Sequence, residues 1–332
     1  MPAGWLQRQW FEQRRLSPAL WLLLPLNWLF IGLARLNCWK TSVQRLPVPV
    51  IVVGNITVGG AGKTPLTIAL AAALRERGWR PGIVSRGYGG ENSEARPVRS
   101  ESLPAEVGDE PILLARRSGV PVWVGRDRAA AGLALLAAHP EVNLILCDDG
   151  LQHYRLGRDL ELAVFDGRGA GNGWRLPLGP LREPLARLNE VDAVICNGLP
   201  DERLPAGVPR FDMRLRPGTF YRLDDAGQHC TAADLAGRKL YALAGIGDPG
   251  RFFRTLEGLG LFCESRPFPD HHAYVAADLA FVRDGILLMT EKDAVKCAGL
   301  TAGETWVLPV EAELPPALIE LVVEKLRGRP TA

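Results

Sequence analysis

A glycine-rich segment near position 60 combines backbone freedom with a charge and a hydroxyl. VGGAGKT, residues 58–64, follows a run of β-branched residues and precedes an alanine- and leucine-rich stretch. A strand, a glycine-rich turn and a helix in this order present backbone N–H groups and a helix N-terminus to an anion. Lys63 can reach the β- and γ-phosphates of a nucleotide, and Thr64 can offer its hydroxyl to Mg²⁺. The segment therefore predicts a site for the phosphates of ATP.

This loop departs from the usual phosphate-binding pattern at one position. The usual pattern, G-x-x-x-x-G-K-[ST], has its first glycine where this chain has Thr57. We expect a loop that is lengthened from Gly54, because the strand before it and the helix after it disfavour a mere turn with an exposed lysine. The residues expected to contact ATP are Thr57, Val58, Gly59, Gly60, Ala61, Gly62, Lys63 and Thr64.

Two aspartates end a later buried strand, LILCDDG, in which Asp148 and Asp149 precede a glycine. Ligands of doubly wound sheets bind at the carboxyl ends of the strands, and an acid placed there can hold Mg²⁺. The glycine-rich loop upstream favours this interpretation over a simple turn. Gln152 and His153 follow on the same rim, and a structural role for His153 stays open.

A third group of candidate residues is split between two distant segments. Asp109 and Glu110 begin a predicted helix, where they could serve only as caps. His271 follows Asp270 in a loop, and an imidazole beside a carboxylate makes a general base for deprotonating an alcohol. Spacing alone does not join Asp109 to His271.

Loop arginines are candidate phosphate clamps, although an isolated loop arginine is more often solvated or ion-paired. The candidates are Arg126, Arg128 and Arg182.

Strands and helices alternate after Leu46, which predicts a P-loop NTPase-like, doubly wound, mostly parallel sheet with a second, smaller α/β lobe. A chain of 332 residues is long enough for two lobes, and sites often lie between lobes. The predicted divisions are a membrane-associating helix in 1–42, a kinase core in 43–205, a β-ribbon linker in 206–235 and a smaller α/β domain in 236–332.

The N-terminal segment 18–34 has one polar residue, Asn27, and no charge. As a helix these 17 residues would reach about 25 Å, the short edge of a bilayer span. Basic residues flank both ends, so the positive-inside rule gives no orientation. We expect a membrane-embedded anchor; a signal peptide and a buried core helix are the alternatives.

Overall composition excludes some partners. The formal net charge is +2, which gives no field for a nucleic acid. Six scattered cysteines without metal-ligand spacing fit a reducing compartment.

Motifs along most of the chain together resemble the tetraacyldisaccharide 4'-kinase family, the lipid A 4'-kinases of Gram-negative lipopolysaccharide biosynthesis. In chain order they are GNITVGGAGKTP, SRGYGG, GDEP, GRDR, DDGLQH, LPLGPLREP, FPDHH and TEKDAVK. The resemblance implies transfer of the ATP γ-phosphoryl group to the 4'-hydroxyl of a tetraacylated glucosamine disaccharide 1-phosphate, which gives lipid IVA. It also implies a membrane lipid substrate and a location at the cytoplasmic face of the inner membrane.

The same resemblance implies roles for individual residues. Asp109 corresponds to the base, working with His271, while Lys63 binds the triphosphate. The implied metal partners are Thr64, Asp148, Asp149 and Glu110. Nucleotide or substrate contacts fall on Gln152, Arg128 and Arg182, and the role of residues 290–296 stays open.

Two other classes of protein are alternatives for such a loop. A membrane-associated P-loop nucleotide switch would bind nucleotide without phosphorylating an acceptor, but a GTPase would need an N-K-x-D motif, which the chain lacks. A soluble P-loop enzyme acting on a small carboxylate would not need the apolar N-terminus. We expect a monomer.

Overall fold

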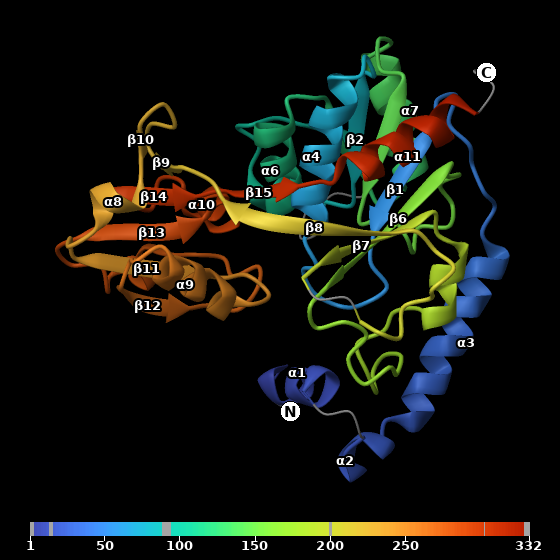
Figure 1. The fold of residues 1–332 in the computed structure, drawn as a ribbon, viewed down its shortest axis with the longest axis horizontal. Helices are drawn as coiled ribbons and strands as arrows, with labels where there is room; N and C mark the ends of the chain where they lie inside the picture. The colour runs from blue at the N-terminus through green and yellow to red at the C-terminus, as the bar shows by residue number, and fades with distance from the viewer. Residues whose placement is uncertain (1–2, 13–15, 88–93, 199–200, 302, 329–332) are drawn as a thin grey trace.

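Runs of β-branched and leucine residues form the central strands of a nine-stranded sheet (Figure 1). The computed structural model describes residues 3–12, 16–87, 94–198, 201–301 and 303–328, so Tyr88 to Gly90 of the SRGYGG motif lie outside the described residues. The sheet order is β15-β8-β7-β6-β1-β5-β2-β4-β3. Its strands are β1 (Val50–Gly54), β2 (Pro81–Ser85), β3 (Arg96–Val98), β4 (Val122–Val124), β5 (Leu144–Asp148), β6 (Leu160–Asp166), β7 (Ala193–Asn197), β8 (Arg210–Pro217) and β15 (Val310–Glu313).

All neighbouring strands from β8 to β4 are parallel, and only the edge strands β3 and β15 run antiparallel to their neighbours. Strands β1 and β5 are buried along their whole length, as expected where helices cover both faces of a parallel sheet. One apolar cluster contains residues of α4, α6 and α11, and another contains residues of α7. The predicted α/β fold with a large, mostly parallel sheet is confirmed. The helices of this part are α4 (Lys63–Arg75), α5 (Pro104–Val107), α6 (Asp109–Ser118), α7 (Arg128–Ala138), η1 (Leu185–Glu190) and α11 (Pro316–Arg327).

A six-stranded sheet of order β10-β9-β14-β13-β11-β12 forms the smaller lobe, on the left of Figure 1. The chain enters it after β8 and returns through β15. Its elements are β9 (Phe220–Arg222), β10 (His229–Cys230), α8 (Ala232–Leu235), β11 (Leu240–Ala244), α9 (Pro249–Gly258), β12 (Cys263–Pro267), η2 (Ala276–Leu279), β13 (Ile286–Thr290), α10 (Glu291–Cys297) and β14 (Thr305–Leu308).

Strand pairing shows which segments belong to each sheet, and it can be compared with the predicted boundaries after residues 42, 205 and 235. These boundaries stay a prediction. Residues 206–235 were expected to link the lobes, but β8 pairs within the larger sheet while β9 and β10 pair within the smaller one. Helix α11, within the predicted smaller domain, packs against α4 of the larger lobe, because its apolar face completes that core.

The N-terminal helices α1 (Ala3–Phe11), α2 (Pro18–Trp21) and α3 (Leu24–Lys40) lie below the larger sheet in Figure 1. Asn27, the polar residue of the apolar segment, is buried and donates hydrogen bonds to the carbonyls of Arg175 (2.7 Å) and Leu176 (2.8 Å). Trp10 donates its indole N–H to the carbonyl of Pro177 at 3.1 Å. These helices are thus attached to the segment after β6, which we call the bridging loop (residues 167–183).

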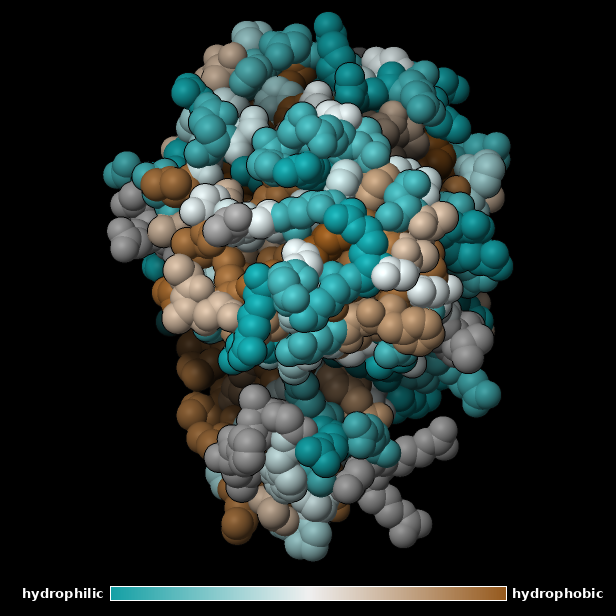
Figure 2. Space-filling view, turned by 90° about the vertical axis from the view of Figure 1, so that its left-hand side faces the viewer, coloured by the Kyte–Doolittle hydropathy of each residue, from teal (hydrophilic) through white to brown (hydrophobic). Residues whose placement is uncertain are grey.

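Many large apolar side chains of the N-terminal helices face outward, and Figure 2 shows hydrophobic surface in the same lower part of the molecule. Exposed members are Trp21, Leu22, Leu26, Trp28, Leu29, Leu33, Leu36 and Trp39. Within the described residues, no helix combines the length and apolar character needed to cross a bilayer.

Candidate active site

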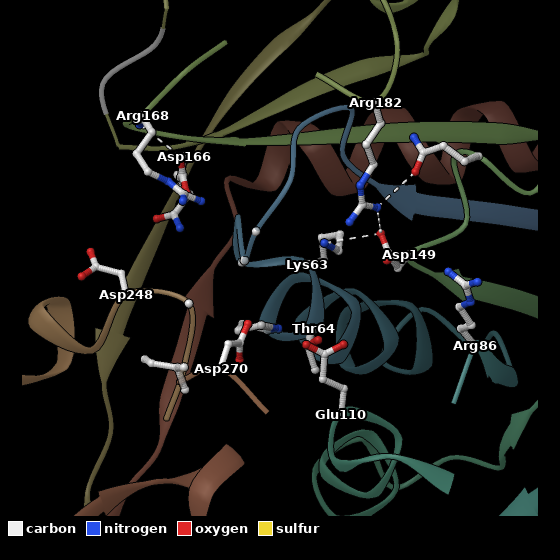
Figure 3. A pocket seen from close by; sticks show the side chains of 18 of the residues that line it. Lys63, Thr64, Arg86, Glu110, Asp149, Asp166, Arg168, Arg182, Asp248 and Asp270 are labelled. Carbon is white, nitrogen blue, oxygen red and sulfur yellow. Dashed lines mark hydrogen bonds and ion pairs between the residues drawn. The ribbon is translucent and has the colours of Figure 1, made fainter. Parts of the chain in front are cut away.

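A cavity of about 1570 Å³ lies where loops of the larger sheet face loops of the smaller one. Figure 3 shows its charged side chains converging from both sides on a central space. The lining comes from the glycine-rich loop, the ends of β5 and β6, the start of α6, the bridging loop, α3, and smaller-lobe segments around residues 247, 271 and 292.

The glycine-rich loop reaches the cavity through part of its predicted length. Gly59, Gly60, Gly62, Lys63 and Thr64 line the cavity. Gly62 has φ of 97° and precedes the first turn of α4, a conformation that disfavours any side chain. The backbone therefore brings the N-terminus of α4 to the edge of the cavity.

The other residues predicted to contact ATP hold the glycine-rich loop in place. Thr57 is buried and forms an isolated bridge with Leu181 of the bridging loop. Val58 donates its N–H to the carbonyl of Pro180 at 2.9 Å, and Ala61 is buried. Thr57, Val58 and Ala61 do not contribute to the lining. The residues between Gly54 and Gly59 thus connect the glycine-rich loop to the bridging loop.

Asn55 is a site residue that sequence reasoning missed. Its buried amide donates to Thr57 Oγ1 and to the Gly59 carbonyl, both at 3.2 Å, and its Oδ1 accepts from Lys63 Nζ at 3.3 Å. One side chain therefore fixes both the loop and its lysine. The residue stands before the first position of the usual motif, which is Thr57 here, so only its place directly after a buried strand could have indicated it.

The two aspartates after β5 occupy different environments. Asp148 is buried and accepts from Thr67 Oγ1 at 3.0 Å, while its Oδ2 has no hydrogen-bond partner among the described residues. Burial raises the pKa of Asp148 to about 7, and the charges of Glu110 and Asp149 add to that rise. The carboxyl group is thus poised for a cation to stabilise its charged form.

Asp149 instead faces basic side chains across the cavity (Figure 3). Its Oδ1 lies 3.4 Å from both Lys63 Nζ and Arg182 Nη1. Burial opposes ionisation of Asp149, yet Lys63 and Arg182 hold its pKa below the ordinary value. Its φ of 50° is rare for a residue with a side chain and indicates a turn held by its surroundings.

The structure joins Asp109 to His271, which lie 162 positions apart in the chain. His271 Nδ1 is 3.1 Å from Asp109 Oδ2. Asp109 begins α6 of the larger lobe, and His271 follows β12 of the smaller lobe with φ of 58°. Both residues line the cavity, so the pair spans the two lobes at the site.

Each member of this pair shifts the protonation of the other. Burial opposes ionisation of Asp109, yet the hydrogen bond from His271 and the charge of Lys292 hold its pKa below the ordinary value. The hydrogen bond to Asp109 raises the pKa of His271, against the opposing effect of burial. The carboxylate is therefore ionised at neutral pH and the imidazole readily takes a proton.

The other predicted residues divide into two groups. Arg182 and Gln152 line the cavity, with Arg182 Nη1 donating to Gln152 Oε1 at 3.3 Å and Gln152 Nε2 donating to the Asn55 carbonyl at 3.0 Å. Glu110 also lines it and accepts from Lys292 Nζ at 2.9 Å.

Arg128 and His153 lie behind the cavity rather than in its lining. Arg128 is buried and donates to the Asp149 carbonyl at 3.3 Å, so it supports the aspartate turn from behind. His153 Nε2 accepts from the Arg128 backbone N–H at 3.2 Å, and burial together with the charge of Arg128 lowers the pKa of His153 to about 4. His153 is therefore neutral at neutral pH. Arg126 is also outside the lining.

Further cavity residues were missed although they share one signal. Arg86 follows β2, Arg168 follows β6, and Asn197 ends β7. All stand at carboxyl ends of parallel strands, where ligands of such sheets bind. Applying that rule to every predicted strand would have found them.

Comparison with known proteins agrees with these features. The family model for tetraacyldisaccharide-1-P 4'-kinase, LpxK, matches residues 19–327. The chain belongs to this family. It is 73% identical to a tetraacyldisaccharide 4'-kinase of Dechloromonas aromatica, over 100% of both chains, and 53% identical to one of Chromobacterium violaceum, over 98% of both.

A solved structure shows that the fold is shared as well. A crystal structure of LpxK from Aquifex aeolicus in complex with ATP superposes with a TM-score of 0.78 at 30% identity, covering 93% of this chain and 99% of that one. The kinase family resemblance drawn from the motifs is therefore confirmed.

Asp109→Asn should lower the pKa of His271, because the charged acceptor that favours the imidazolium is removed. The measurement is an NMR titration of protein labelled with ¹⁵N-histidine, and the wild-type pKa is expected above that of a free imidazole. Asp278→Asn is the control, since Asp278 pairs with the neighbouring His272 and not with His271. An unchanged His271 pKa in Asp109→Asn would show that the pair does not form in solution.

Proposed function

We propose that this protein transfers the γ-phosphoryl group of ATP to the 4'-hydroxyl of a tetraacylated disaccharide 1-phosphate, and that its core works as a P-loop-type kinase. The observation that carries the proposal is the shared cavity: a carboxylate–imidazole pair and the lysine of the glycine-rich loop line the same space. Membership of the kinase family and the likeness to an ATP complex support it.

Binding of ATP falls to the glycine-rich loop and its surroundings. The N-terminus of α4 offers unpaired backbone N–H groups to the phosphates, and Lys63 and Arg182 add positive charge. Both cations face Asp149, so bound phosphate oxygens would compete with that carboxylate for them. Gly59 and Gly60 let the backbone approach the phosphates closely.

The donor set suits Mg²⁺. Thr64 and Asp149 line the cavity beside the buried Asp148, whose Oδ2 has no partner among the described residues. Across residues 3–328, where described, no group of three or more His, Cys, Asp or Glu is arranged to hold a metal alone. This is expected for Mg²⁺, which uses one or two carboxylates together with water and substrate phosphates. Bound there, it would neutralise charge on the phosphates.

Glu110 was also expected to bind the metal, and we propose only an indirect part for it. Its carboxylate already accepts a hydrogen bond from Lys292. The charge of Glu110 raises the pKa of Asp148, so it contributes to the negative potential that attracts a cation.

Asp109 is the proposed base. As the 4'-oxygen forms its bond to the γ-phosphorus, the bond from that phosphorus to the β,γ-bridging oxygen breaks and ADP leaves. The hydroxyl proton passes to the Asp109–His271 pair, which is ionised and oriented before substrate arrives. Because the pair is supplied by two lobes, both substrates would meet it only within the cavity that these lobes share.

The N-terminal helices are proposed to lie in the cytoplasmic face of the inner membrane. A tetraacylated substrate stays in the bilayer, because each buried methylene is worth about 0.8 kcal/mol. Phe30, Ala34 and Arg35 of α3 line the same cavity as Lys63, so the cavity extends from the proposed lipid surface to the phosphate loop. A monomer remains our expectation.

The alternative is a nucleotide switch that phosphorylates no acceptor. Such a switch would not need the Asp109–His271 pair, which serves to take a proton from an acceptor hydroxyl.

Purified protein given γ-labelled ATP and the disaccharide 1-phosphate should yield labelled lipid. Lys63→Ala should lower kcat/KM on the order of 100-fold through lost phosphate stabilisation. Lys325→Ala is the control, because Lys325 is an exposed residue of α11 that pairs with Asp192. Labelled inorganic phosphate without labelled lipid would support the switch instead.

Replacing Trp28, Leu29 and Leu33 together by Gln should weaken binding to phospholipid vesicles. These side chains are 65%, 57% and 57% exposed, and each contributes about 1 kcal/mol when buried in lipid, so we expect a loss on the order of 100-fold in partitioning. Vesicle flotation measures the bound fraction. Leu133→Gln, an exposed leucine on α7, is the matched control. Equal flotation of all three proteins would place the membrane contact elsewhere.

A further inference from the structure

Lys292 is a largely buried lysine at the start of α10 that no step of the proposed mechanism uses. It lines the cavity with a side chain only 16% exposed. Its Nζ donates to Glu110 Oε1 at 2.9 Å and lies 3.4 Å from Asp270 Oδ1. A largely buried ammonium keeps its charge only where carboxylates surround it. The charges of Glu110, Asp109 and Asp270 raise the pKa of Lys292 against the effect of burial.

The two partners of Lys292 are the chain neighbours of the Asp109–His271 pair. Glu110 follows Asp109 on the larger lobe, and Asp270 precedes His271 on the smaller lobe. Asp270 Oδ1 also accepts the backbone N–H of His271 at 3.1 Å, so it shapes the turn that holds the imidazole. One ammonium therefore links the residue beside the carboxylate to the residue beside the imidazole.

Helix α10 is anchored so that Lys292 has a fixed position. Asp293 is fully buried and accepts from Thr290 Oγ1 (2.6 Å), Tyr274 Oη (2.9 Å) and the Gly245 N–H (3.1 Å). Glu291 of the same turn pairs with Arg117 of α6, across the lobes. These contacts fix α10 so that its lysines, Lys292 and Lys296, lie beside Glu110 and Asp109 at the start of α6.

We propose that Lys292 is a positioning residue for the Asp109–His271 pair. By holding Glu110 and Asp270, it sets the distance between a carboxylate of one lobe and an imidazole of the other. The inference rests on the proposed kinase function. Without the ammonium, three acids of the site, Asp109, Glu110 and Asp270, would repel one another, and the lobes would lose a link beside the reacting groups.

Charge supports the same role. The groups facing Asp109 are His271, Lys292 and Lys296, and those facing His271 are Asp109, Asp270 and Lys292. Lys292 lowers the pKa of both members of the pair. Its removal should therefore raise the pKa of His271.

The test compares Lys292→Met with Lys292→Arg in the full-length enzyme. Because a misplacement of about 1 Å can cost on the order of 100-fold in rate, Lys292→Met should lower kcat about 10- to 100-fold. Its KM for ATP should change less than about threefold, since it holds the base and not the nucleotide. Lys292→Arg, which keeps the charge and reaches both acids, should recover most of kcat. Lys239→Met, an exposed lysine of the smaller lobe, is the matched control.

Each outcome decides the proposal. A kcat within twofold of wild type in Lys292→Met overturns it, and so does a raised KM for ATP at unchanged kcat, which would make Lys292 a phosphate ligand. If Lys292→Met does not fold, Asp270→Asn weakens one of the two links at constant size, because it removes the carboxylate charge that faces Lys292. It should lower kcat with KM for ATP retained, and wild-type kcat there overturns the proposal. Wild-type enzyme that phosphorylates no lipid would instead overturn the proposed function.

Discussion

The hydrogen bond between Asp109 and His271 is the constraint on which the site depends, because it can form only when both lobes hold one relative position. Two neighbouring contacts also cross between the lobes: Glu110 meets Lys292, and Arg117 meets Glu291. Single ion pairs at a surface are weak, but a partly buried network with fixed geometry is stronger. The lobes are thus held together at the point where the chemistry is proposed.

The bridging loop connects the N-terminal helices to the glycine-rich loop. On one side its carbonyls accept hydrogen bonds from Asn27 and Trp10 of the N-terminal helices. On the other side Leu181 pairs with Thr57, and Arg182 reaches Asp149. The segment proposed to meet lipid and the loop proposed to meet ATP therefore share one support, which explains how a bilayer-bound acceptor and a soluble nucleotide can meet in one cavity.

Sequence patterns predicted the local features well. The strand, glycine-rich turn and helix around Lys63 follow from neighbouring residues, and so does the acidic end of β5. Features set by packing between distant segments did not follow from local patterns. Only family resemblance joined Asp109 to His271. The residues around Arg128 did not indicate that its side chain would lie outside the cavity and donate a hydrogen bond to the Asp149 carbonyl. Asn55 was missed because its role depends on the path of a loop, which a motif does not describe.

A double-mutant cycle on Asp109 and His271 tests the central claim most directly. The kcat for lipid phosphorylation would be measured for wild type, Asp109→Ala, His271→Ala and the double variant. Because the two residues act as one unit across the lobes, the double variant should be about as slow as the slower single variant. Losses that multiply would show that the two side chains act separately, and would contradict a site assembled by both lobes.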